Sequence, residues 1–193
     1  MRLFLVSSNL HKFQEIQKIL KEYKIEILFY QYELPELQSD SLENIALFSA
    51  KHAYSLIQQP LFTEDTGFFI ETLNGFPGPY ASYIFKTIGN QGILDLLEKK
   101  SNRKAIFRTV IAVVLSNTKF ITFLGEAKGT IALVEKGDKG WGYDPIFIPL
   151  EGDKRSYGEM HIDEKNKLSH RRKALILMSE YLNKHFPNYE KRI

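Results

Sequence analysis

The chain contains no cysteine among its 193 residues. This absence excludes disulfide bonds, thiolate metal sites, iron–sulfur clusters and a cysteine nucleophile. No apolar run approaches the roughly 20 residues that span a bilayer. The N-terminal sequence MRLFLVSSN also lacks the long apolar stretch of a signal peptide. We therefore expect no membrane association and a cytoplasmic location.

A large surplus of one charge is also absent. Lys and Arg together number 26 and Asp and Glu number 23, which leaves a formal net charge of +3. So small a surplus is no signature of nucleic-acid binding, so we expect no nucleic acid polymer as a partner. Hydrophobic residues make up 44% and aromatic residues 13% of the chain, which is typical of a folded protein. The length suits one domain over 1–193, built as two small lobes.

The chain begins with a predicted β–α–β unit. Residues 2–6 read as a short apolar strand, and small polar residues end it. From Leu10 the apolar residues recur at helical spacing, with Ser8 or Asn9 as the helix cap. A second strand at 25–30 then favours a parallel pair.

Later segments add helices and antiparallel strands. Residues 105–115 and 119–127 are rich in β-branched and aromatic residues around a hairpin-type turn. Parallel and antiparallel pairs together predict an α/β fold with a mixed sheet. The other expected strands are 61–63, 68–73 and 146–148, and the other expected helices are 45–57, 80–88, 93–97 and 169–184.

Two segments place cations at the start of a predicted helix. Lys12 lies in the first turn after Ser7-Ser8-Asn9, and His170 and Arg171 follow Ser169. The helix dipole disfavours a cation there unless an anion compensates it. Each segment alone also fits a capped helix with solvated charges. Because the pattern occurs twice, we predict a shared anionic ligand.

Acidic and aromatic segments complete the predicted site. Glu64 and Asp65 follow a buried-looking strand, and Glu36 lies in a separate loop. Carboxylates at a strand end hold Mg²⁺ together with phosphate oxygens, although a polar turn would have the same sequence. In residues 140–145, GWGYDP, an aromatic face lies between glycines and can stack on a base, unless Trp141 is a core residue. Together these segments describe a site for Mg²⁺ and a nucleoside triphosphate.

Several separated segments, in this order along the chain, resemble the inosine triphosphatase family, also called Ham1-like. They are SSNLHK with Glu15 behind it, FTEDTGFFIETLNGFPGPY, GWGYDPIF and EKNKLSHRRKA. The phrases LNGFPGPY, TIGNQGIL and SAKHAY are most similar to archaeal-type members. The resemblance implies a Mg²⁺-dependent hydrolase that cleaves inosine, deoxyinosine and xanthosine triphosphates to the monophosphate and pyrophosphate. It also implies a homodimer with an elongated α/β fold, in which two lobes enclose a central substrate cleft.

The resemblance also assigns roles to residues. It implies Asp65 as the proton acceptor, Glu64 and Lys12 as further catalytic residues, and Glu36 and Asp65 as metal ligands. The expected substrate-binding residues are Ser7, Ser8, Asn9, Leu10, His11, Lys12, Thr66, Trp141, Gly142, Tyr143, Asp144, Lys165, His170 and Arg171.

The chain departs from the family pattern at three places. Ser8 stands where glycine is usual, Lys51 is out of register with the second-helix lysine of bacterial members, and Ala81 replaces a frequent serine. Two alternatives stay open. A non-catalytic nucleotide or nucleic-acid binding module would have no need of Glu36 and Asp65. A related pyrophosphatase could act on modified pyrimidines or another altered base.

Overall fold

The chain begins with strand β1 (Arg2–Ser7), helix α1 (Leu10–Lys21) and strand β2 (Glu26–Gln31). The computed structural model describes residues 1–23 and 25–186. β1 pairs in parallel with β2, and at Phe4 and Leu5 it pairs in parallel with β3 (Leu61–Ile70). The predicted β–α–β start is therefore confirmed.

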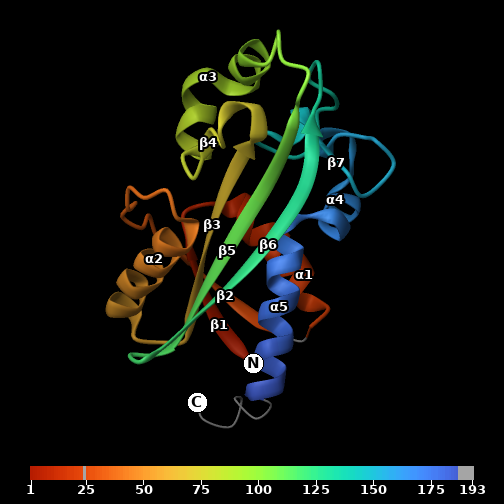
Figure 1. Cartoon of the computed structure of the whole chain (residues 1–193). Coiled ribbons are helices and arrows are strands. Elements are labelled where there is room, and N and C mark those ends of the chain that lie inside the picture. Colours follow the sequence, from red (N-terminus) through yellow and green to blue (C-terminus); the bar gives the residue numbers. More distant parts are fainter. Residues whose placement is uncertain (24, 187–193) are drawn as a thin grey trace. The chain divides into compact units, whose positions relative to one another are not determined.

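Figure 1 shows the remaining helices and strands. The helices are α2 (Leu42–Ile57), α3 (Ala81–Leu96), α4 (Ile162–Leu168) and α5 (His170–His185). The strands are β4 (Pro77–Gly78), β5 (Lys104–Ser116), β6 (Lys119–Ile131) and β7 (Phe147–Pro149). Short 3₁₀ turns cover Glu71–Leu73, Asp144–Ile146 and Tyr157–Glu159.

All the strands belong to one mixed sheet in the order β2-β1-β3-β5-β6-β7, with β4 paired to β3. The β3–β4 and β6–β7 pairs are antiparallel, in contrast to the parallel pairs of β1. This confirms the expected α/β fold with a mixed sheet flanked by helices. No helix of the described residues is long and apolar enough to cross a membrane.

Contacts along the chain define two compact units. Among the described residues, the first unit comprises 1–65, 109–125 and 171–186, and the second comprises 66–108 and 126–170. Strands β3, β5 and β6 each contribute residues to both units. Each unit has its own hydrophobic core.

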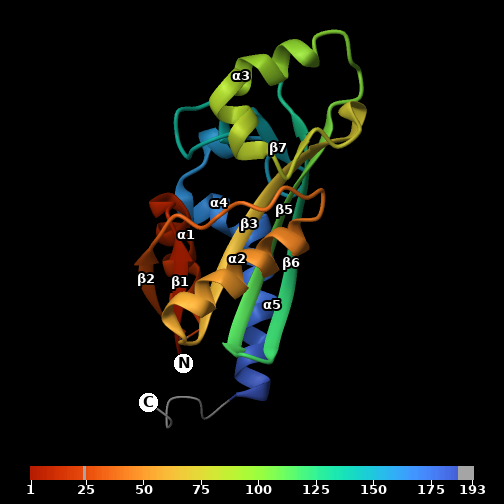
Figure 2. The ribbon, with the colours of Figure 1, turned by 90° about the vertical axis from the view of Figure 1, so that its left-hand side faces the viewer.

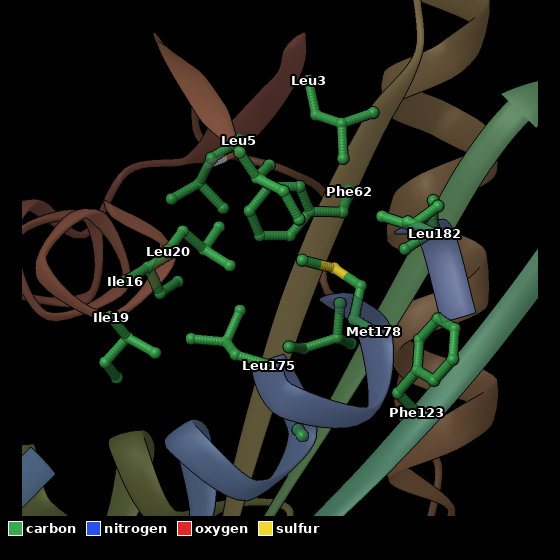
Figure 3. Packing of buried hydrophobic residues seen from close by; sticks show 14 of the residues in the cluster. Leu3, Leu5, Ile16, Ile19, Leu20, Phe62, Phe123, Leu175, Met178 and Leu182 are labelled. Atoms are coloured by element: carbon green, nitrogen blue, oxygen red, sulfur yellow. The ribbon is translucent and has the colours of Figure 1, made fainter. Parts of the chain in front are cut away.

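The core of the first unit forms where α1 and α5 pack on the sheet (Figure 3). Ile16 and Ile19 of α1 meet Leu175 and Met178 of α5, and Phe62 of β3 contributes from the sheet. These five side chains are at most 1% exposed. On the same helix α5, Leu182 is buried whereas Leu177 is exposed.

The core of the second unit is rich in aromatic rings. Phe68 stacks on Phe107 at 4.4 Å and on Tyr143 at 4.7 Å between ring centroids. Helix α3 covers this core as two segments that point in different directions (Figure 2). The break lies at Gly89, whose φ of 65° and ψ of −164° are not helical. The two separate helices expected at 80–88 and 93–97 correspond to these segments.

Strand β3 corrects one sequence prediction. Glu64 to Gly67 do not follow a strand end, because β3 continues without a break from Leu61 to Ile70. The backbone pairs with β1 at the start of this run and with β4 at its end, so the ladder holds the polar residues extended. The expected strand at 68–73 ends earlier, since Glu71–Leu73 is a 3₁₀ turn.

The C-terminal region also differs from the prediction. Lys165 and Asn166 lie on the short helix α4, which the periodicity did not predict. Ser169 separates α4 from α5 in an extended conformation. The expected strand at 146–148 begins one residue later, because Ile146 ends a 3₁₀ turn.

Candidate active site

The start of α1 exposes several of the expected phosphate-binding residues. Asn9 is the N-cap, and its side chain accepts a hydrogen bond from the backbone N–H of Lys12 at 3.1 Å. The Ser7 hydroxyl in turn accepts from the N–H of Asn9 at 3.1 Å. Ser8, Leu10 and His11 are exposed. First-turn N–H groups and the helix dipole make this end of α1 favourable for an anion.

Lys12 points from α1 to Glu64 on β3. Its ammonium lies 2.6 Å from the Glu64 carboxylate and also donates to the Glu64 backbone carbonyl at 3.2 Å. The side chain of Lys12 is 16% exposed, whereas that of Glu64 is 1% exposed. Lys12 is therefore the accessible member of a pair whose carboxylate is buried.

Arg171 of α5 binds the same carboxylate from a buried position. Its guanidinium donates to Glu64 Oε1 at 3.0 Å and 3.2 Å, and it forms a further ion pair with Glu15 of α1. Thr109 of β5 also donates to Glu64 Oε1, at 3.1 Å. The side chain of Arg171 is 1% exposed. These contacts join α1, β3, β5 and α5 in one polar cluster of the first unit.

The carboxylates decide the protonation of Arg171. Burial of the guanidinium acts to lower the pKa of Arg171, but the charges of Glu64 and Glu15 outweigh it, so this pKa is raised. The cluster thus has two cations, Lys12 and Arg171, and two anions. The chain itself supplies carboxylates that balance these two cations, and the shared anionic ligand stays a prediction.

Glu64 and Asp65 face opposite sides of the sheet. Side chains alternate between the two faces of a strand. Phe62 and Glu64 lie on the face of β3 that packs against α1 and α5. Thr63 points the other way, where its hydroxyl donates to the Ala46 carbonyl of α2 at 3.0 Å. Asp65 shares the face of Thr63 by this alternation, and it is half-buried. The expected acidic pair is therefore two carboxylates in different surroundings.

Glu36 lies in the segment between β2 and α2, and it is exposed. In the described part of the chain, no three His, Asp or Glu side chains gather into a ready-made metal cage. Mg²⁺ is commonly held by only one or two carboxylates, with phosphates and waters completing its shell. The hard oxygen donors of Glu36 and Asp65, both in the first unit, fit that chemistry.

The aromatic loop of the second unit is organised by a buried ion pair. Lys165 of α4 lies 2.6 Å from Asp144, and both side chains are at most 5% exposed. Asp144 also accepts the backbone N–H of Trp141 at 2.9 Å. The ammonium of Lys165 lies 5.4 Å from the centre of the Trp141 ring, which is within cation–π range. Trp141 itself is half-buried, so it is not a core residue.

Two expected substrate contacts, Tyr143 and His170, have buried side chains. Tyr143 is 4% exposed, its hydroxyl donates to the Ala81 carbonyl at 2.9 Å, and burial raises its pKa. His170 stacks on Phe107 with 4.7 Å between ring centres. Gly142, by contrast, is half-buried with φ of 64°, and Thr66 is half-buried on β3.

Sequence reasoning did not foresee the roles of Glu15, Thr109 and Asn90. Glu15 carried a usable signal, because it adjoins Ile16 on the buried face of α1 and is 2% exposed. A buried carboxylate needs a partner, so a distant cation could have been expected. Thr109 looks like any strand residue, and Asn90 like any helix residue, so neither gave such a signal.

Known proteins share this fold and sequence. A relative from Methanopyrus kandleri named dITP/XTP pyrophosphatase is 47% identical over 181 residues, which cover 94% of this chain and 96% of the relative. A relative of the same name from Pyrococcus horikoshii is 42% identical, and the match covers 94% of this chain and 97% of the relative. The solved structure of a HAM1 protein from Coxiella burnetii has a TM-score of 0.81 at 29% identity. The match covers 94% of this chain and 99% of that protein. The Ham1 family profile matches residues 3–181. The chain therefore belongs to the Ham1 family.

Proposed function

We propose that this protein is a nucleoside triphosphate pyrophosphatase. It hydrolyses altered purine nucleotides such as ITP, dITP and XTP to the monophosphate and pyrophosphate, and so removes them from the nucleotide pool. The observation that carries this proposal is the near full-length similarity to proteins named dITP/XTP pyrophosphatase. The polar residues at the start of α1 and along β3 support it, because they suit phosphate chemistry.

Lys12 is the proposed contact to the triphosphate. Its partly exposed ammonium can exchange the Glu64 carboxylate for a phosphate oxygen, and the start of α1 offers backbone N–H groups beside it. Arg171 acts differently in this proposal, because its guanidinium is buried by two carboxylates. It positions Glu64, and through Glu64 it positions Lys12.

Asp65 is the proposed proton acceptor for the water that attacks the α-phosphorus. In that step the water oxygen bonds to phosphorus, pyrophosphate leaves, and Asp65 takes the water proton. Glu64 suits this role less well, because its carboxylate already binds Lys12, Arg171 and Thr109. By the alternation of side chains along β3, Asp65 lies on the opposite face of the strand from Glu64.

We propose Mg²⁺ as the cofactor, with Glu36 and Asp65 as its protein ligands. When bound, Mg²⁺ neutralises charge on the phosphate oxygens. A titration with Mn²⁺, followed by electron paramagnetic resonance, tests the ligands without turnover. We expect Glu36→Gln to weaken Mn²⁺ binding. Glu33→Gln, an exposed carboxylate three residues away, is the matched control and should bind as the native protein does.

The loop around Trp141 is the proposed base-binding element. Trp141 offers a stacking face, and a donor to the 6-oxo group would accept inosine and xanthine and reject adenine. In the structure the Trp141 backbone N–H already binds Asp144, and the Arg171 guanidinium binds Glu15 and Glu64.

Pyrophosphate release from dITP, measured with and without Mg²⁺, tests the activity. We expect release only with Mg²⁺. A non-catalytic binding module would bind dITP without releasing pyrophosphate, and a substrate panel with modified pyrimidine triphosphates separates the other alternative. Asp65→Asn should lower kcat by about 10²- to 10⁴-fold, because a general base is lost. Near-normal turnover in Asp65→Asn would remove this residue from the mechanism.

We also propose a homodimer in the cytoplasm, where the nucleotide pool lies. Large apolar side chains with exposed surface support an interface, among them Leu133 at 78%, Leu150 at 68% and Val134 at 61%. Strand β5 is a poor candidate for this interface, because most of its apolar residues are buried. Light scattering should give twice the chain mass of 22.4 kDa, and a mass of one chain contradicts the proposal.

A further inference from the structure

The loop from Gly140 to Asp144 is tied to helix α3 at two points. The Tyr143 hydroxyl donates to the carbonyl of Ala81, the first residue of α3. Farther along the same helix, the side-chain amide of Asn90 donates to the Gly142 carbonyl at 3.2 Å. All of these residues belong to the second unit.

The kink in α3 makes the second tie available. Gly89 has a positive φ of 65°, and Asn90 opens the helical segment that follows. Ile93 and Leu94 anchor that segment in the core of the second unit. A Cβ added at Gly89 would meet no atom within 4 Å, so its backbone conformation is the reason for glycine here.

The orientation of the Asn90 amide follows from its partners. The Asn90 side chain contacts the Gly142 carbonyl and Glu135 Oε2, which lies 3.2 Å away. Both atoms can only accept a hydrogen bond, so the amide nitrogen of Asn90 must face them. The Asn90 side chain is buried, and within residues 1–23 and 25–186 its Oδ1 has no hydrogen-bond partner. The side chain is therefore held by its two N–H groups alone, and a carboxylate of the same shape could not replace it.

We propose that Asn90 is a positioning residue for nucleobase recognition. By holding the Gly142 carbonyl, its amide sets the course of the backbone next to Trp141 and so the orientation of the stacking ring. Gly142 itself has a positive φ of 64° and no side chain that could fix the backbone by packing, and a Cβ at this position would meet open space. This inference rests on the proposed function, in which the loop binds the base.

Steady-state kinetics with dITP test the positioning role. Asn90→Asp keeps the size of the side chain but turns the donor into an acceptor facing a carbonyl and Glu135. We expect KM for dITP to rise about tenfold, because a buried hydrogen bond becomes a repulsion. We expect kcat to change much less, since the residues proposed to act on the triphosphate are untouched. Gln91→Ala is the matched control, because Gln91 is exposed and its side chain contacts Asp95 one turn along the helix.

Fluorescence gives a second readout that needs no turnover. Trp141 is the protein's single tryptophan, so its emission reports on this loop alone. We expect Asn90→Asp to increase quenching of Trp141 by acrylamide, while Gln91→Ala leaves it unchanged. Gly89→Ala should act in the same direction, because it strains the kink that brings Asn90 to the loop.

The two readouts separate failure of this inference from failure of the proposed function. If the native protein hydrolyses dITP and Asn90→Asp keeps the native KM and quenching, the positioning role is wrong. If the native protein releases no pyrophosphate, the proposed function fails, and the role in base recognition falls with it; the quenching data then still decide whether Asn90 restrains the loop. Asn90→Ser, which shortens the side chain without adding charge, serves where Asn90→Asp is too unstable. Native KM and quenching in Asn90→Ser would likewise overturn the proposal.

Discussion

Arg171 shows how a cation at the start of a helix can be balanced by carboxylates of the chain itself. As a cation in the first turn of α5, it indicates an anionic ligand by the helix dipole. In the structure its guanidinium instead lies between Glu15 and Glu64, each on a different element. Glu64 also pairs with Lys12, so the two cations and the two carboxylates of this cluster balance each other's charge before any substrate binds.

Glu15→Gln should destabilise the protein by about 3–5 kcal/mol, because it leaves Arg171 buried with one carboxylate fewer. Glu22→Gln is the matched control. Glu22 also joins the end of α1 to an arginine of α5, Arg172, but its side chain is 56% exposed. An exposed pair of this kind contributes about 1 kcal/mol or less. Urea denaturation measures both changes, and equal losses in the two variants would contradict a special role for the buried pair.

Helix α4 is a short element that positions a buried ion pair. It has only seven residues, yet it carries Lys165 into the buried pair with Asp144. Its first turn is closed by a capping box, in which the Glu164 carboxylate accepts the His161 N–H at 2.9 Å. A sequence window of seven residues is too short for helical periodicity to stand out, so α4 was not predicted.

The capping box of α4 should be sensitive to strong acid. The Arg155 side chain and the His161 N–H both bind the Glu164 carboxylate and lower its pKa from the ordinary 4.5 to about 2. Because the folded-state pKa is depressed, the stabilisation is complete above the unfolded-state value and is lost as pH falls through about 2. We expect the stability difference between the native protein and Glu164→Gln to stay constant above pH 5 and to shrink toward pH 2. Urea denaturation at several pH values measures it, with the exposed Glu98→Gln as control; a difference that grows toward pH 2 contradicts the assignment.

The whole chain distributes its proposed functions over two units, each with its own core. The first contains Lys12, Glu36, Glu64 and Asp65, the residues proposed for the phosphates and the metal. The second contains the loop around Trp141, proposed for the base. The substrate cleft implied by the family resemblance stays a prediction.

Selectivity is the property that belongs to the whole molecule, because it needs both phosphate chemistry and base recognition. We expect kcat/KM for ITP to exceed that for GTP by about tenfold or more, since both bases have a 6-oxo group and only the 2-amino group of guanine can be rejected. Pyrophosphate release at low substrate concentration measures the ratio. Equal values would contradict a role in clearing altered purines and leave the pyrophosphatase chemistry intact.

The sequence by itself determined the β–α–β start, the long hairpin, a cap at Ser8 or Asn9 and the family, because periodicity, capping and motif order are local properties of the chain. Only the tertiary structure decided that β3 runs unbroken through Glu64 and Asp65, that the two carboxylates face opposite sides, and that Tyr143 lies in the core. Arg171 and Glu64 are 107 positions apart, and their pairing depends on how α5 packs against β3. Such contacts arise when distant elements meet, and no local pattern of residues encodes which side chains will face each other.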